Sequence, residues 1–211
     1  MITLYHSVGS RAVVPLWLLL ELGVSYRIAG TDIRKKWQKT SGYLRINPMG
    51  KVPALDDGGV VVTEVPAICL YLADKYSYGT LAPTIEDPAR GPYLKWMVFS
   101  TAVFEPGVWL PPAANARDAS DFGWGHRDIM LDMLDAALTA EPWLLGDRFS
   151  AADITLGGIF AIAYFNKKIP ERPAFAAYIA RFCERPAFHR AREITWPNTD
   201  DTLETNDLQE R

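Results

Sequence analysis

The chain has 211 residues, of which 49% are hydrophobic and 22% are charged. This length allows one domain or two small ones with a sizeable core, and the composition excludes a disordered, collagen-like or low-complexity protein. The formal net charge is −3, which argues against the broad basic surface of a nucleic-acid-binding protein.

Compartment and metal content follow from what the sequence lacks. It has no run of 18 uncharged apolar residues and no basic leader before an apolar stretch, so we expect neither a membrane span nor a secretory signal. Cys69 and Cys183 cannot form a disulfide framework, and no Cys/His cluster points to a metal. We therefore expect a cytoplasmic protein without a metal and without nucleic-acid or membrane partners.

The first part of the chain alternates strand and helix patterns. Ile2–His6 is short, apolar and β-rich, which predicts a buried strand, and Ser7–Ser10 follows as a turn. Apolar residues recur at helical spacing over Arg11–Leu22, and Gly23 stands where helices commonly end. Ser25–Ile28 is predicted as a second strand.

A β-hairpin and a helix follow. The turn residues Asp57–Gly59 separate two strand-like segments, Pro53–Asp56 and Val60–Thr63. Pro66 can occupy the first position of a helix that runs to Tyr76, because proline needs no hydrogen-bond donor there. Strands and helices in this order predict an α/β layout over one sheet.

Beyond residue 88 the periodicity is helical. Ser150–Asp153 has the form of an acidic capping box ahead of an apolar run. Glu105–Gly107 is expected to end or kink the helix before it. The other predicted helices are Ala89–Val103, His126–Ala140, Pro173–Cys183 and Pro186–Ile194.

These patterns divide the chain into four parts. Residues 1–77 form the α/β domain, 78–88 a linker, 89–197 an all-helical domain and 198–211 a mobile tail. The tail carries five acids and one base. Residues 1–80 carry a formal net charge of +3, which is compatible with a solvated face or with a small anionic partner.

Three stretches together resemble the cytosolic glutathione transferase family, in its bacterial type with a serine-like active site. The first contains Met1–Tyr5, Ser10-Arg11 and Trp17–Gly23. The second runs from Asn47 to Leu55 and continues through Thr63-Glu64 and Ala67–Ala73, and the third is Leu145–Ile154. The resemblance covers nearly the whole chain and implies a thioredoxin-like N-terminal domain, an all-α C-terminal domain and a homodimer.

The family resemblance implies a role for Ser10. A helix N-terminus favours an anion, and a serine hydroxyl that donates to the glutathione sulfur would further stabilise the thiolate nucleophile. Arg11 would add a neighbouring N–H and a positive charge. Ser10 aligns best and Ser7 is its rival; alternatively, Ser10 only caps the first helix.

The glutathione-binding half is implied by the second stretch. The resemblance implies a cis Val52–Pro53 bond, with the Val52 backbone pairing with the cysteinyl part of glutathione. Lys39, Lys51 and Asn47 are candidate contacts to the carboxylates of glutathione.

Glu64 and Val65 carry a departure from the family pattern. Glu64 would face the α-ammonium of glutathione, and Val65 would offer its N–H to the γ-glutamyl carboxylate. Val65 stands where the family usually has serine, so one hydroxyl donor is missing. That donor is worth about 1.5–3 kcal/mol to a charged group.

The leading hypothesis is an enzyme of detoxification that activates the glutathione thiol for attack on small, largely apolar electrophiles. A partly apolar cleft between the domains would take the second substrate. Its candidate lining residues are His6, Ser7, Phe99, Phe104, Trp109 and Tyr164, although such aromatics are as commonly core residues. The alternatives are a non-catalytic binding protein on the same scaffold, and a glutathione-dependent reductase or dehalogenase. A reductase would need a cysteine in the first turn, which this sequence lacks.

Overall fold

The computed structural model describes residues 1–110 and 122–197, which fall into two compact units. Unit 1 contains residues 1–77 together with the segment from Arg185 onward, and unit 2 contains Tyr78–Glu184. The expected mobile tail, residues 198–211, lies outside the described residues.

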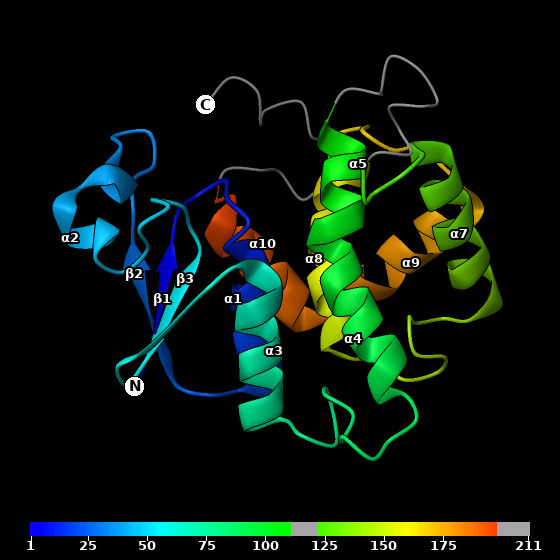
Figure 1. Ribbon diagram of the computed structural model, residues 1–211, viewed down its shortest axis with the longest axis horizontal. Helices are drawn as coiled ribbons and strands as arrows, with labels where there is room; N and C mark the ends of the chain where they lie inside the picture. Colours follow the sequence, from blue (N-terminus) through cyan, green and yellow to red (C-terminus); the bar gives the residue numbers. More distant parts are fainter. Residues whose placement is uncertain (111–121, 198–211) are drawn as a thin grey trace. The chain divides into compact units, whose positions relative to one another are not determined.

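Unit 1 is built on a four-stranded mixed sheet with the order β2-β1-β3-β4 (Figure 1). β1 (Ile2–His6) pairs in parallel with β2 (Tyr26–Gly30) and antiparallel with β3 (Ala54–Asp57). β3 forms the predicted hairpin with β4 (Val60–Thr63). The strand and hairpin predictions are therefore confirmed, with shifts of one or two residues at the strand ends.

Helices cover both faces of this sheet. α1 (Val13–Leu22) and α3 (Val65–Tyr76) pack side by side, and α1 ends at Gly23 in the left-handed conformation that glycine favours. On the sheet face that Tyr5 occupies, the Tyr5 ring meets that of Tyr43 edge-on at 5.6 Å between centroids. Tyr43 belongs to α2 (Ser41–Leu44), which follows the 3-10 helix η1 (Trp37–Lys39). The sequence patterns did not predict either of these short helices.

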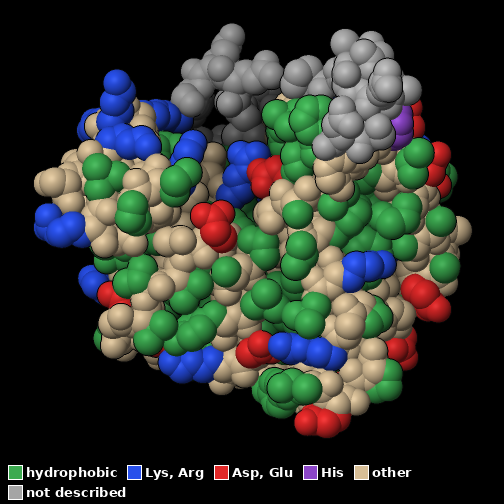
Figure 2. Space-filling view, in the orientation of Figure 1, with side chains coloured by type: hydrophobic (Ala, Val, Ile, Leu, Met, Phe, Trp, Pro, Cys, Tyr) green, Lys and Arg blue, Asp and Glu red, His purple; other side chains and the backbone are tan. Residues whose placement is uncertain are grey.

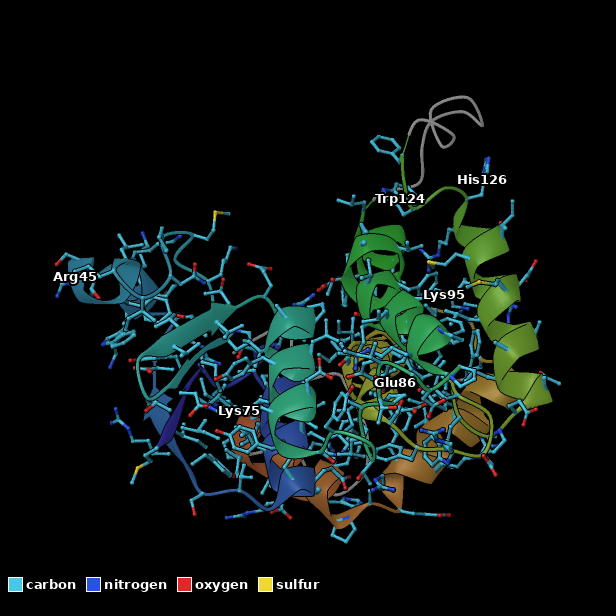
Figure 3. The ribbon with its side chains drawn as sticks, turned by 60° about the horizontal axis from the view of Figure 1, so that its bottom comes forward. Arg45, Lys75, Glu86, Lys95, Trp124 and His126 are labelled. Atoms are coloured by element: carbon cyan, nitrogen blue, oxygen red, sulfur yellow. The ribbon has the colours of Figure 1, made fainter. Side chains whose placement is uncertain are left out.

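A buried carboxylate fastens the hairpin to α3. Asp57, at the end of β3, accepts hydrogen bonds from the hydroxyls of Tyr71 (3.0 Å) and Tyr76 (2.6 Å). Its third donor is the Lys75 ammonium at 2.5 Å, which Figure 3 shows projecting from α3. These donors hold the pKa of Asp57 below its usual range, and the resulting charged network fixes the C-terminal half of α3 against the sheet.

The last described helix, α10 (Pro186–Thr195), packs on α1 in unit 1. The sequence placed these residues in the all-helical domain 89–197. The helix prediction is confirmed, but the packing partner differs from that expectation. Phe188 contacts the Trp17 ring edge-on at 4.9 Å, and Arg185 forms a bidentate ion pair with Glu21.

In the part of unit 2 that the structure describes, the regular secondary-structure elements are all helical. They are α4 (Arg90–Phe99), the π-helical turn η2 (Ser100–Phe104), α5 (Glu105–Trp109), α7 (Arg127–Ala140), α8 (Ala151–Phe165) and α9 (Pro173–Cys183). The helix does not end at Glu105–Gly107, because the chain stays helical through Pro106; a kink there stays a prediction. The wider π turn precedes Pro106, which then occupies the first turn of α5, where no intrahelical donor is needed.

α8 is the central helix of unit 2 and is buried along most of its length. Its predicted capping box is confirmed, since Ser150 accepts from Ala152 N–H and Asp153 accepts from Ser150 N–H at 2.9 Å. Gly157 lets α9 approach closely, because a Cβ there would meet the Phe182 ring at 3.2 Å. Phe104 is fully buried and stacks on Phe160 of this helix.

Candidate functional site

The turn between β1 and α1 carries the candidate catalytic residues. Ser10 is 8% exposed, and its hydroxyl accepts a hydrogen bond from Ala12 N–H (3.3 Å) while donating to the Ser7 carbonyl (2.6 Å). Ser10 thus lies two residues before Ala12, the N-cap of α1, and so near the helix N-terminus that the thiolate hypothesis requires. The N-cap of α1 is Ala12, and no side-chain cap bond is formed there, so the alternative interpretation of Ser10 as the helix cap is wrong. Arg11 is half-buried beside it.

Ser7, the rival, is nearly as buried, at 4% exposed. Its hydroxyl donates to the carbonyl of Val8 at 3.3 Å, a longer bond than the one Ser10 makes. Ser7 therefore supports the turn chiefly through its carbonyl, which receives the Ser10 proton.

The segment before Pro53 is the second component, and the Val52–Pro53 bond is cis, as the resemblance implied. The Lys51 carbonyl accepts from the Tyr43 hydroxyl (2.6 Å) and from the Asn47 side-chain amide (2.9 Å). Among the described residues, the N–H and C=O of Val52 have no hydrogen-bond partner. Val52 therefore offers a backbone N–H and C=O without partners in the described part of the chain, next to a firmly held neighbour.

Two sequence-predicted contacts acquire different roles in this segment. Asn47 is 3% exposed, and its amide groups bond to the Lys51 carbonyl and to Met49 N–H (3.0 Å). It shapes the loop instead of facing a ligand, which corrects its expected contact to a carboxylate. Lys39 donates to the Met49 carbonyl at 3.0 Å and lies against Gly50, whose missing Cβ would fall 2.7 Å from the Lys39 ammonium.

Exposed positive charge surrounds this loop. Figure 2 shows lysine and arginine side chains gathered over η1 and α2, and Figure 3 shows Arg45 beside α2. The exposed basic residues of the segment are Arg34, Lys35, Lys36, Lys39, Arg45 and Lys51. Asp32 is the acidic residue between positions 31 and 51 and pairs with Lys35 at 3.7 Å. The net charge here favours an anionic ligand.

The third component is the start of α3. Glu64 has φ 69° and ψ 125°, an unfavourable backbone conformation for a residue with a Cβ. Such strain costs about 1–3 kcal/mol and is common at ligand-binding sites. Val65 is 8% exposed and Pro66 follows it in the first turn, so the helix begins with one N–H fewer than usual.

The predicted co-substrate residues do not share one environment. Phe104 belongs to the core of unit 2, which corrects its assignment to a pocket. His6 is 4% exposed in unit 1 and its Nε2 lies 2.9 Å from Thr195 Oγ1, so its side chain has a structural partner. Phe99, Trp109 and Tyr164 are half-buried in unit 2 and remain candidates.

In residues 1–110 and 122–197, no group of three or more His, Cys, Asp or Glu side chains could hold a metal ion. Over the same residues, no helix has the length and apolar character to cross a membrane.

Comparison with known protein families gives two matches. Residues 1–74 match the family model "Glutathione S-transferase, N-terminal domain", and residues 117–181 match "Glutathione S-transferase, C-terminal domain".

Individual relatives agree with the family models. The chain is 34% identical to glutathione S-transferase hmp2 of Hypomyces subiculosus, over 72% of this chain and 78% of the relative. It is 28% identical to glutathione S-transferase GstA of Escherichia coli O157:H7, over 87% and 93%.

Solved structures support the same assignment. A glutathione transferase from Methylococcus capsulatus superposes with a TM-score of 0.75 at 30% identity, covering 92% of this chain and 98% of that one. A sphingomonad glutathione S-transferase complexed with glutathione gives 0.72 at 29% identity, with the same coverage. With its mixed sheet, its cis Val52–Pro53 turn and its helical second unit, the chain belongs to the cytosolic glutathione transferase family and is a glutathione transferase.

Proposed function

We propose that Ser10 activates the thiol of glutathione for attack on small, largely apolar electrophiles. The observation that carries this proposal is the position of the Ser10 hydroxyl, which accepts from Ala12 N–H at the start of α1. Glutathione would release its thiol proton to solvent. The thiolate would then form the carbon–sulfur bond with the electrophile.

The hydrogen bond to sulfur requires only a small change in Ser10. Its proton is directed to the Ser7 carbonyl when no ligand is bound. Rotation of the hydroxyl about its C–O bond would redirect that proton to a bound thiolate, with Ala12 N–H still donating to the same oxygen. A bond of this kind to a charged acceptor is worth about 1.5–3 kcal/mol. Arg11 would add positive potential.

The rest of unit 1 would hold the peptide of glutathione. The N–H and C=O of Val52, which have no partner within residues 1–110 and 122–197, would pair with the cysteinyl backbone as an added strand does. The Val65 N–H and the positive end of α3 would receive the γ-glutamyl carboxylate, with Glu64 facing its ammonium. Lys51 and Lys39 would attract the glycyl carboxylate.

The remaining features of the proposal concern partners and setting. The co-substrate would be taken by the half-buried aromatics Phe99, Trp109 and Tyr164. We also propose a homodimer that acts in the cytoplasm in detoxification.

One observation favours a second candidate function. Val65 lacks the hydroxyl that would help to anchor glutathione, and this favours a non-catalytic protein with an altered ligand. Retention on immobilised glutathione, followed by a spectrophotometric conjugation assay with an aromatic electrophile, separates the two. Retention with turnover supports the enzyme, whereas retention without turnover across several electrophile classes supports the binding protein. The absence of both retention and turnover would refute both uses of glutathione.

A further inference from the structure

The end of α10 holds the turn between β1 and α1 at two points. Gly9 N–H donates to the Thr195 carbonyl at 2.9 Å, and the Thr195 hydroxyl lies 2.9 Å from His6 Nε2. Thr195 is fully buried although it stands 189 positions after His6 in the sequence. One residue therefore contacts the chain both before and within the segment that carries Ser10.

α10 is held firmly enough to act as a support. At its N-terminal side, Arg185 donates to both carboxylate oxygens of Glu21 on α1, at 2.6 and 2.7 Å. Midway, Phe188 packs against Trp17 of α1. The turn leads directly into α1, α10 packs on α1, and Thr195 at the end of α10 bonds back to the turn. Each of the three segments is therefore in contact with the other two.

The other half of the His6 contact is equally fixed. The His6 carbonyl accepts from both the N–H (2.7 Å) and the hydroxyl (3.1 Å) of Thr31. Burial lowers the pKa of His6 to about 4, so its imidazole is neutral near pH 7. A neutral imidazole has one donor and one acceptor, and the Thr195 hydroxyl can complement either.

We propose that Thr195 is a positioning residue for the thiolate site. Its hydroxyl bond to His6 and its carbonyl bond to Gly9 hold the turn so that the Ser10 hydroxyl can reach sulfur by rotation alone. This inference rests on the proposed role of Ser10. A shift of about 1 Å in a reacting group is enough to lower a catalytic rate substantially, so a support this close to Ser10 affects its chemistry.

The test compares Thr195→Val, which removes the hydroxyl and keeps the branched shape, with Thr195→Ser, which restores a hydroxyl. Thr155→Val is the matched control, because Thr155 is also fully buried and donates to the Ala151 carbonyl (2.7 Å) in unit 2. The measurements are the ultraviolet thiolate absorbance of bound glutathione against pH, kcat, and hydrogen exchange at the Gly9 amide without ligand.

The Thr195→Val variant should raise the pKa of the bound thiol, lower kcat near pH 7 roughly three- to tenfold and speed Gly9 exchange, with glutathione affinity little changed. This range corresponds to the loss of one ordinary hydrogen bond. Thr195→Ser should resemble the wild type. Thr155→Val should lose stability without altering the titration or Gly9 exchange.

The inference is overturned if Thr195→Val titrates and exchanges like the wild type, or if Thr195→Ser is as impaired as Thr195→Val. Ser10→Ala separates this inference from the function on which it rests. A titration shifted by Ser10→Ala but not by Thr195→Val refutes positioning by Thr195 alone. A shift with Thr195→Val but not with Ser10→Ala refutes the role of Ser10 and, with it, the positioning of its hydroxyl by Thr195. No shift in either variant refutes both.

Discussion

Replacing His6 by glutamine should remove a specific dependence of stability on pH. His6 is 4% exposed, and burial lowers its pKa from 6.5 to about 4 in the folded chain. Above pH 6.5 the imidazole is neutral in both the folded and unfolded states, so its contribution to stability is fully present. As the pH falls from 6.5 through 4, the unfolded state takes up a proton that the folded state excludes, and stability is lost.

The two pKa values set the size of the effect. A difference of one in pKa corresponds to about 1.4 kcal/mol, so His6 should cost about 2 kcal/mol at pH 5 relative to pH 8, and about 3 kcal/mol below pH 4. Asp153 acts in the opposite direction, because burial raises the pKa of its carboxyl to about 6. Its folded form keeps a proton that the unfolded form releases, so stability from Asp153 rises as the pH falls from 6 to 4.

The assay is urea unfolding of the wild type and His6→Gln at several values between pH 5 and pH 8. Glutamine retains an amide that can reach Thr195, and Asp153 contributes equally to both proteins. The difference between their free energies of unfolding therefore isolates His6. We expect the wild type to lose about 2 kcal/mol more than the variant between pH 8 and pH 5. Parallel pH profiles would refute the reasoning, because they would mean that folded His6 accepts a proton as readily as unfolded His6.

Three further outcomes are expected. Val65→Ser should raise the affinity for glutathione several-fold in calorimetric titration, because one charge-assisted donor gives a net gain on the order of 1 kcal/mol. Unchanged affinity would mean that the peptide does not lie at the start of α3. Glu64→Gly should be about 1 kcal/mol more stable in urea unfolding than Glu64→Ala, because glycine tolerates the positive φ of 69°. Both variants should lose affinity for glutathione. Equal stabilities would show that this backbone is not strained. Sedimentation at micromolar concentration should show a dimer, and a species of 23.6 kDa alone would contradict the proposed homodimer.

Local patterns predicted most elements of the fold because each has a signal within a few residues. The Asp57–Gly59 turn located the hairpin, and Ser150 with Asp153 located the start of α8. The packing partner of a helix has no such local signal. Phe188 and Ala191 show that α10 has a buried face, but an amphipathic pattern does not say which unit covers it.

The candidate site likewise contains some features that the sequence specifies locally and others that depend on distant residues. The position of Ser10 and the cis Val52–Pro53 bond were predicted because the resemblance specifies them residue by residue. The roles of Asn47, His6 and Thr195 depend on bonds to the backbone or to distant residues, and residue type alone does not distinguish a ligand contact from a support. Asn47 was already a candidate contact within the recognised stretch, and its burial and its bonds to Lys51 and Met49 are what identify it as a support.

The most direct test of the central claim is the pH titration of the thiolate absorbance of glutathione bound to the wild type, Ser10→Ala and Ser7→Ala. A hydrogen bond from Ser10 stabilises only the charged sulfur, so its loss should raise the pKa of the bound thiol by about 1 to 2, with little change in the affinity for glutathione. Ser7→Ala should titrate like the wild type, because the Ser7 carbonyl that accepts from Ser10 remains in place. A Ser10→Ala variant that titrates like the wild type would contradict the proposed role of Ser10, and a raised pKa in Ser7→Ala alone would assign that role to Ser7.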